Sequence, residues 1–189
     1  IELLRNEKPV VVSYGNYAAS GGYWISNECD KIFTNETTLT GSIGVFSMVP
    51  NFEKIIKEKA RINIVNINSN EHSDLMTLTK PLDKEEIAYM QKSVENIYDS
   101  FLSIVANGRD MTTEEVDKIA QGRVWSGTDA MKIGLTDEIG TVADALQYTV
   151  NISGLEEYRL VEYPKVKTQM EKIMESFGQA ESTMDKLSN

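Results

Sequence analysis

Residues 9–24 read PVVVSYGNYAASGGYW and carry the signals that decide the fold of this chain. The apolar, β-branched residues 9–14 are typical of a short strand that is covered on both faces. The chain then reaches one hydroxyl, Ser20, which is followed at once by two glycines and two large aromatic residues. Because a glycine pair costs backbone entropy, it indicates either a tight turn or a place where another group approaches the backbone.

Strands alternate with helices on either side of this stretch. The strongest helix begins after Asp83, because Glu86 completes a capping box with it and an amphipathic stripe continues to Gly108. Further helices are expected over residues 1–6, 20–29, 51–59, 112–122, 126–134, 141–152 and 167–177, and further strands over residues 31–34, 61–66 and 158–163. Residues 67–81 have no clear period and indicate a loop. The alternation predicts an α/β domain with mainly parallel strands and flanking helices.

Length and composition limit the classes of function. The 189 residues are enough for one domain with a hydrophobic core, which we expect over residues 1–177, followed by a polar, disordered tail over residues 178–189. The net charge of −10 disfavours binding of nucleic acid, because it repels phosphate groups. One cysteine, Cys29, and one histidine, His72, supply neither an internal disulfide nor a multi-histidine metal centre. We therefore expect no metal and no cofactor.

The chain begins in mid-pattern with IELLRNEKPVVV, which lacks an initial Met and the basic start of a signal peptide. No run approaches the roughly 18 apolar residues that a membrane helix requires. We expect the chain to be a fragment of a longer protein.

Ser20 has the surroundings that nucleophilic catalysis requires. A helix that starts here presents free N–H groups and a partial positive charge, which can stabilise an oxyanion. Gly21 and Gly22 leave room for a substrate carbonyl to reach those N–H groups, and the preceding strand holds the serine at the edge of the sheet. The alternative is that Ser20 is only a helix N-cap and the glycines only a turn.

A second stretch, LTGSIGVF at residues 39–46, places Ser42 between two glycines. It could hold a hydroxyl beside the first site, where it would orient a base or a water, or it could be a simple turn into a strand. A nucleophile also needs a base. His72 is one candidate for that base, although a lone histidine in a polar loop is more often a solvated surface residue.

Taken together, YAASGGYWIS and TLTGSIGV resemble the signal peptide peptidase A family, whose members are serine–lysine peptidases with a Clp-protease and crotonase type of fold. The resemblance continues through residues 94–146 and so covers most of the chain. It implies that Ser20 is the nucleophile, that the Gly21 N–H is an oxyanion-hole donor, and that Ser42 bonds the catalytic lysine. A lysine buried beside Ser20 would lose its charge by desolvation and become a usable base.

The chain departs from single-domain members of this family in the segment that carries their lysine. That segment, residues 67–81, offers His72 and Lys80, and Lys80 beside Pro81 is most simply a solvated charge. In the long, duplicated members the N-terminal half gives the lysine and the C-terminal half gives the serine. The chain resembles such a C-terminal half, and we expect the isolated fragment to be inactive.

The family further implies cleaved signal peptides or other apolar peptides as substrates. It also implies the N-terminal half of the same protein as a partner, a homo-oligomer, and a place at the bacterial cytoplasmic membrane with the catalytic domain on the outer face. Two other functions stay open. One is a crotonase-like acyl-CoA enzyme, which would usually place Glu or Asp near its oxyanion hole; the other is a non-catalytic half that scaffolds an assembly.

Overall fold

The computed structural model describes residues 1–164 and 169–170, and the chain divides into two compact units, Ile1–Gly154 and Leu155–Asn189. The boundary expected between residues 177 and 178 lies outside the described residues, as does most of the helix expected over 167–177.

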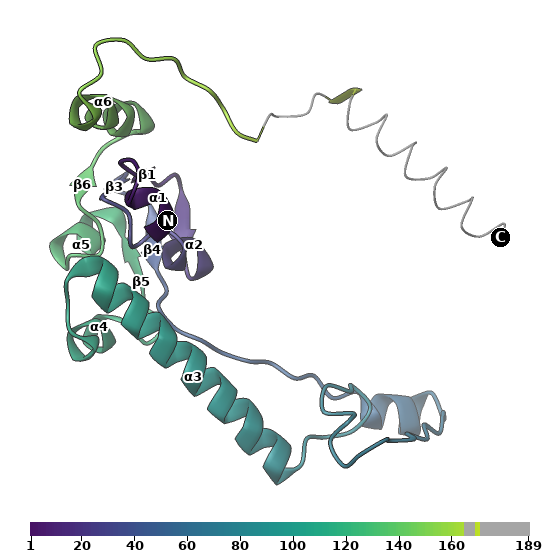
Figure 1. The fold of residues 1–189 in the computed structure, drawn as a ribbon. Helices are drawn as coiled ribbons and strands as arrows, with labels where there is room; N and C mark the ends of the chain where they lie inside the picture. Colours follow the sequence, from purple (N-terminus) through teal and green to yellow (C-terminus); the bar gives the residue numbers. More distant parts are fainter. Residues whose placement is uncertain (165–168, 171–189) are drawn as a thin grey trace. The chain divides into compact units, whose positions relative to one another are not determined.

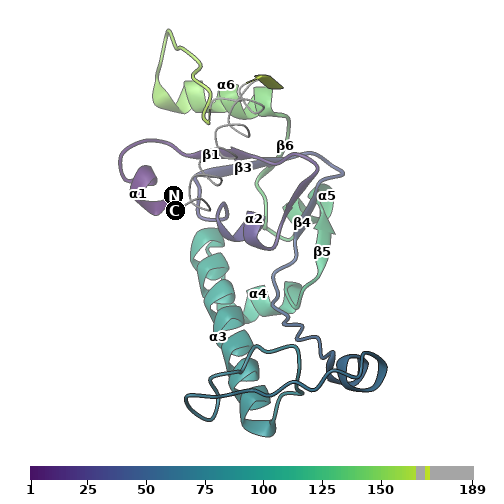
Figure 2. The same ribbon diagram turned by 90° about the vertical axis from the view of Figure 1, so that its right-hand side faces the viewer.

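The first sheet is parallel and is built around the apolar strand that opens the sequence argument. Its strands are β1 (Val11–Ser13), β3 (Lys31–Thr34) and β6 (Glu138–Ile139), in the order β1-β3-β6. Helix α6 (Val142–Ser153) packs on one face of this sheet, and α2 (Gly21–Trp24) lies on the opposite side (Figure 2). The two apolar residues of β3, Ile32 and Phe33, are buried between these layers, and the residues of β1 are partly buried.

The second sheet carries the two serine motifs. Its strands are β2 (Tyr17–Ala19), β4 (Leu39–Gly41) and β5 (Val124–Ser126), with β2 parallel to β4 and β4 antiparallel to β5. Three of the four strand pairings in the described residues are parallel. The expected α/β class with mainly parallel strands is therefore confirmed.

The helices follow local signals closely. The longest, α3 (Lys84–Arg109), begins at Asp83 with the expected capping box, in which the Asp83 side chain accepts from the backbone N–H of Glu86 and the Glu86 carboxylate accepts from that of Asp83. Helix α4 (Thr113–Ile119) has the same device at Thr112. The structure also describes α1 (Glu2–Arg5), α5 (Gly127–Lys132) and a π-helix, η1 (Ile55–Lys59). Figure 1 shows α4 lying beside α3.

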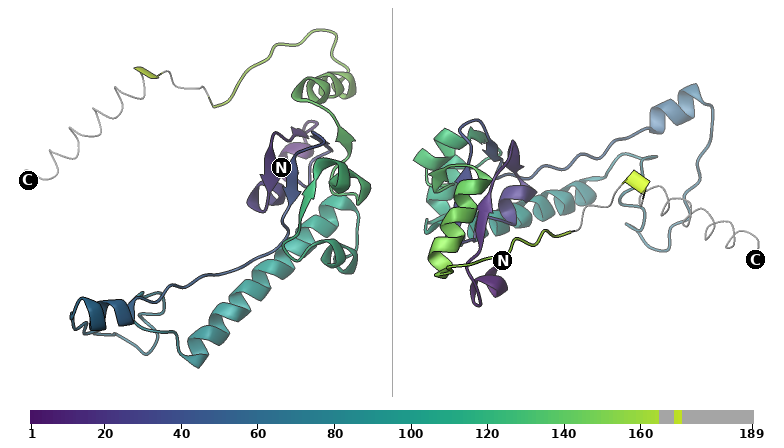
Figure 3. Two further views of the ribbon diagram at one scale, coloured as in Figure 1. Left: turned by 180° about the vertical axis from the view of Figure 1, so that it is seen from behind. Right: turned by 90° about the horizontal axis from the view of Figure 1, so that it is seen from above.

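Two expected strands are wrong. Residues 61–66 and 158–163 form no strand, and residues 61–66 are exposed throughout. Among the described residues, no strand pairs with residues 61–66, and a strand gains its stability from cross-strand contacts. Residues 42–82 instead lead from the end of β4 to the start of α3, with η1 as their regular element (Figure 3). Helix α2 is also shorter than the expected 20–29, and α4 ends before Gly122, which does not cap it.

The core lies between the sheets, α2, α3 and the α4–α5 region. It gathers side chains from distant parts of the chain, among them Tyr23, Ile32, Phe101, Val116 and Leu135, each no more than 1% exposed. In the described residues, no helix combines the length and the apolar composition that crossing a membrane requires.

Candidate active site

Ser20 lies on a sharp turn between β2 and α2 and has an unusual backbone conformation. Its φ is 53° and its ψ is −119°, although it is not a glycine. Such a conformation costs roughly 1–3 kcal/mol and persists where the surroundings enforce it. Ser20 occupies the N-cap position of α2, but its side chain makes no capping hydrogen bond. The interpretation of Ser20 as a mere N-cap therefore fails on its geometry. A strained strand-to-helix turn that exposes a serine is typical of nucleophilic serines.

The strained turn is held by neighbours on both sides. The Ser20 N–H donates to the Gly41 carbonyl at 2.9 Å, and the Ser20 carbonyl accepts from the Trp24 N–H at 2.8 Å. Helix α2 is anchored by Tyr23, which is fully buried and donates its hydroxyl to the Leu135 carbonyl at 2.8 Å. The Ser20 backbone is thus fixed to β4 and to the core, while its side chain is exposed.

The glycines after Ser20 are not required by the domain's own packing. A Cβ added at Gly21 or at Gly22 would meet no atom within 4 Å, and neither residue has a positive φ. Both residues are exposed, and N–H groups in the first turn of a helix have no acceptor within the helix. The space in front of this turn is therefore open to a ligand from outside the domain.

Ser42 occupies an equivalent place at the end of the neighbouring strand. Because Ala19 is paired with Gly41 in parallel register, Ser20 and Ser42 leave adjacent strands at the same edge. Ser42 also has a positive φ, of 50°. Its N–H donates to the Arg123 carbonyl at 2.8 Å, which continues the pairing of β4 with β5. The two serines predicted from separate motifs are thus brought together.

Both serines line one cavity of about 600 Å³. Its other lining residues come from the segment after β4, from α3 and from the turn before β5: Gly44, Val45, Phe46, Gln91, Val94, Glu95, Tyr98, Gln121 and Gly122. The lining is partly apolar, and among the described residues it includes neither a lysine nor a histidine. The polar members from α3 were missed by the sequence argument, although the spacing of Gln91, Glu95 and Tyr98 places them on one helical face.

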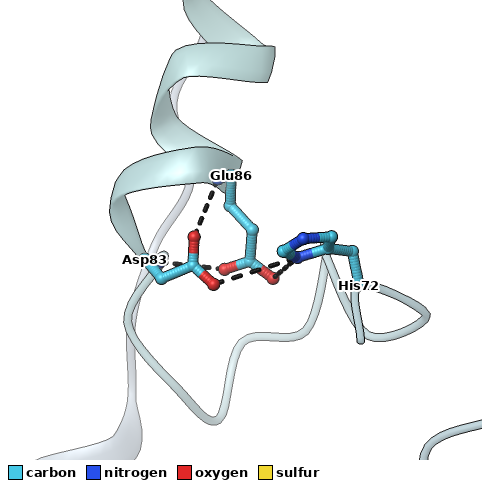
Figure 4. A group of neighbouring side chains, drawn as sticks. All are labelled: His72, Asp83 and Glu86. Carbon is cyan, nitrogen blue, oxygen red and sulfur yellow. Dashed lines mark hydrogen bonds and ion pairs between the residues drawn. The ribbon is translucent and has the colours of Figure 1, made fainter. Parts of the chain in front are cut away.

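His72 is not brought to Ser20. It lies against the first turn of α3, where its Nδ1 is 3.8 Å from Asp83 Oδ2 and 3.6 Å from Glu86 Oε1 (Figure 4). The part of α3 that lines the serine cavity begins at Gln91, and Glu95 there is about 13 Å along the helix axis from Glu86. His72 is therefore not the base for Ser20, because the carboxylates of Asp83 and Glu86 hold it at the first turn of α3.

Lys80 belongs to the same group of charges. Its ammonium group lies 2.7 Å from Asp74 Oδ1 and 3.0 Å from Glu86 Oε1. Hydrogen bonds to these two carboxylates raise the pKa of Lys80 above its usual value, so it remains charged. A general base must be able to lose its proton near the working pH. The pairing supports the view that Lys80 is not the catalytic lysine.

The described residues include one group with the geometry of a metal site: His72, Asp83 and Glu86 offer ligand atoms within 4.8 Å of one another (Figure 4). A positive charge is already present in this group, because the Lys80 ammonium forms an ion pair with Glu86 Oε1, the same atom that faces His72. Desolvation lowers the pKa of His72, but the Glu86 side chain and the other nearby carboxylates outweigh it and raise the pKa above its ordinary value. These groups form an ion-pair network that fastens the preceding loop to α3.

Comparisons with known proteins identify the family of the chain. The sequence model of Peptidase family S49 matches residues 2–155. This chain belongs to Peptidase family S49. The expected membership of the signal peptide peptidase A family is thereby confirmed. The S49 match includes both serine turns and the whole of α3.

Relatives of this S49 chain are longer proteins. It is 45% identical over 153 residues to Protease 4 of Haemophilus influenzae, covering 77% of this chain and 25% of that protein. It is 33% identical over 190 residues to "Serine protease SPPA, chloroplastic" of Arabidopsis thaliana, covering 98% of this chain and 28% of that protein. The chain thus spans about a quarter of the length of these relatives.

A solved structure is also among the similar proteins. An enoyl-CoA hydratase from Polaromonas sp. JS666 is aligned over 78% of this chain and 39% of its own, with a TM-score of 0.32 and 12% sequence identity.

Proposed function

We propose that this chain is the serine-bearing part of a serine–lysine peptidase in which Ser20 is the nucleophile. The observation that carries the proposal is the turn at Ser20: a strained, exposed serine without a capping bond, which shares one cavity with Ser42. The name of the Arabidopsis relative, a serine protease, supports the serine type.

The proposed reaction begins when Ser20 Oγ attacks the carbonyl carbon of a peptide bond. A lysine takes the hydroxyl proton, and the Gly21 N–H helps to stabilise the oxyanion that forms. The carbon–nitrogen bond then breaks, and the lysine returns the proton to the leaving amine. Water hydrolyses the acyl-enzyme and restores Ser20. Ser42 bonds the lysine and orients it.

The lysine is proposed to come from the N-terminal half of the same protein. Two features support this assignment. The described residues that line the cavity include no lysine, and Lys80 is held as a charged partner of Asp74 and Glu86. The chain also spans about a quarter of the length of Protease 4 of Haemophilus influenzae and of the Arabidopsis relative, which leaves room for a second half in those two proteins. The isolated chain is accordingly proposed to be inactive.

Substrate, partners and location follow from the family resemblance. We propose cleaved signal peptides or other apolar peptides as substrates, in keeping with Val45, Phe46 and Val94 in the cavity wall. A homo-oligomer and a position at the outer face of the cytoplasmic membrane belong to the same proposal. The crotonase-like alternative loses its support, since the S49 match covers both serine motifs. A scaffolding half without catalysis remains as an outcome of the test below.

The decisive comparison is the cleavage of an apolar peptide by the complete protein and by its Ser20→Ala variant. We expect kcat to fall by about 10⁴-fold or more, as for other serine nucleophiles. The matched control is Ser100→Ala, because Ser100 is exposed on α3 and its hydroxyl bonds the nearby Asn96 carbonyl. Undiminished turnover by Ser20→Ala would overturn the nucleophile assignment. A wild-type protein without any turnover would favour the scaffolding role.

A further inference from the structure

The positive φ of Ser42 is maintained by a second strained turn, formed by residues 121–123 (the 121–123 turn). The Ser42 N–H donates to the Arg123 carbonyl, and the Gly122 N–H donates to the Ile43 carbonyl, both at 2.8 Å. The two segments approach so closely that a Cβ on Gly44 would lie 2.6 Å from backbone atoms of Gly122. The position of Ser42 therefore depends directly on the 121–123 turn.

The 121–123 turn is itself in an unfavourable conformation. Gln121 has a φ of 57° and Gly122 a φ of 76°, so two consecutive residues lie in the left-handed region. This conformation is sterically strained at Gln121, because Gln121 has a side chain. Neighbouring structure must hold the turn in place.

Tyr98 supplies such a hold from helix α3. Its hydroxyl accepts a hydrogen bond from the Gln121 N–H at 3.3 Å and donates one to Asp117 Oδ1 at 2.5 Å. Tyr98 thus connects α3, the last turns of α4 and the start of the 121–123 turn through a single oxygen atom. It also lines the cavity that contains Ser20 and Ser42.

The chemistry of Tyr98 favours a fixed hydrogen bond over proton transfer. Burial and the Asp117 carboxylate raise the pKa of Tyr98 to about 12. The phenol therefore keeps its proton throughout the neutral range and donates to Asp117 without exchanging protons with a substrate. A hydrogen bond to a charged acceptor is also stronger and shorter than one between neutral groups.

We propose that Tyr98 is a positioning residue for the Ser42 hydroxyl, and that it acts through the 121–123 turn with Asp117 as its anchor. The proposal rests on the proposed function, in which Ser42 orients the catalytic lysine. A loss of the Tyr98 hydroxyl would release the Gln121 N–H, relax the turn and displace Ser42 from its working position.

The test is a double-mutant cycle in the complete protein, with kcat/KM for an apolar peptide measured across pH. Tyr98→Phe is expected to lower kcat/KM about tenfold, mainly through kcat, since small misplacements of catalytic groups are costly. Its pH profile is expected to move in the same direction as that of Ser42→Ala. In a Ser42→Ala background, the same change is expected to cost less than about twofold, because the group it positions is already gone.

Three further variants provide a second way to remove the anchor, a rescue and a control. Asp117→Ala removes the anchor and is expected to lower kcat/KM about threefold, again with no loss in the Ser42→Ala background; this variant serves if Tyr98→Phe fails to fold. Asp117→Asn retains an acceptor oxygen and is expected to restore the wild-type profile. Tyr89→Phe is the matched control, because Tyr89 is exposed on the same helix and lies outside the serine cavity.

Equal losses in the wild-type and Ser42→Ala backgrounds, or an unmoved pH profile in Tyr98→Phe, would overturn the positioning role. The proposed function fails on a different result, namely retained activity in Ser20→Ala. The two failures are therefore distinguishable.

Discussion

Two groups of polar side chains in this chain differ in how much of their bonding capacity they use. At the serine turns, Ser20 and Ser42 have positive φ angles, and within the described residues neither hydroxyl has a hydrogen-bond partner. At the start of α3, the carboxylates of Asp83 and Glu86 accept backbone N–H groups and also face the imidazole of His72 and the ammonium group of Lys80.

This difference indicates that the serine turns are available for reaction, whereas the charged groups at the start of α3 stabilise the fold. A strained backbone with an unengaged hydroxyl gains nothing for stability, so its retention calls for a function. Carboxylates that are capped and paired already have the partners that a catalytic role would require them to give up. The lone histidine, which would attract attention in a sequence, therefore belongs to the structural group.

The largest expected effect follows from Ser20→Gly. Glycine accepts the positive φ without strain, so the variant should lose turnover to background while its unfolding free energy rises by about 1 kcal/mol. That gain corresponds to roughly 2–4 °C in the midpoint of thermal unfolding. Calorimetry and peptide cleavage on the same preparation measure both quantities. A destabilised Ser20→Gly variant would show that the turn is not strained.

Gly44→Ala should have the next largest effect. Its new Cβ would meet rigid backbone of Gly122 at 2.6 Å, so the segment that carries Ser42 must shift. A shift of about 1 Å is expected to lower kcat/KM about 100-fold. Gly15→Ala is the matched control, because a Cβ on Gly15 meets no atom within 4 Å. Equal activities of the two variants would show that the close approach of Gly44 to Gly122 does not position Ser42.

Gly21→Ala separates stability from activity. The domain has room for this Cβ, so thermal unfolding should be unchanged or occur at slightly higher temperature. A substrate carbonyl approaching the Gly21 N–H would meet the new methyl group, and kcat/KM should fall about tenfold through a raised KM. Steady-state kinetics check this expectation. Full activity would mean that the glycine provides no clearance for a substrate.

The smallest expected effect concerns His72→Gln. The pKa of His72 is raised in the folded chain, so its ion pairs are fully present below the ordinary value near 6.5 and are lost as pH rises through the raised pKa. The unfolding temperature of the wild type should therefore fall between pH 5.5 and pH 8.5. The fall should be larger in the wild type than in the variant. Peptide cleavage at neutral pH should be little changed. Parallel pH curves for the two proteins would exclude a contribution of His72.

The sequence predicts best what local interactions determine. The capping boxes at Asp83 and Thr112 are present as expected, because their donors and acceptors lie three residues apart. Strands β2 and β4 were not anticipated, since each has three residues and exists through pairing with a partner more than 20 residues away. The strand expected over 61–66 fails for the converse reason: its pattern is suitable, but no strand in the described part of the chain pairs with it.

The candidate site shows the same division. Ser20, Gly21 and Ser42 could be named from two short motifs, because each serine directly follows a strand and lies beside a glycine. The backbone strain at Ser20 could not be foreseen, as it arises from the attachment of the turn to Gly41 and to the core. Tyr98 lies within the helix predicted after Asp83, but its bonds to Asp117 and Gln121 depend on the packing of α4 against that helix.

The most direct measurement of the central claim locates the acyl group during turnover. The complete protein is mixed with an activated ester of an apolar peptide and quenched in acid, and the modified residue is identified by mass spectrometry. The account predicts that the acyl group is carried by Ser20, in the peptide that contains the Ser-Gly-Gly sequence. An acyl group on any other residue would contradict it.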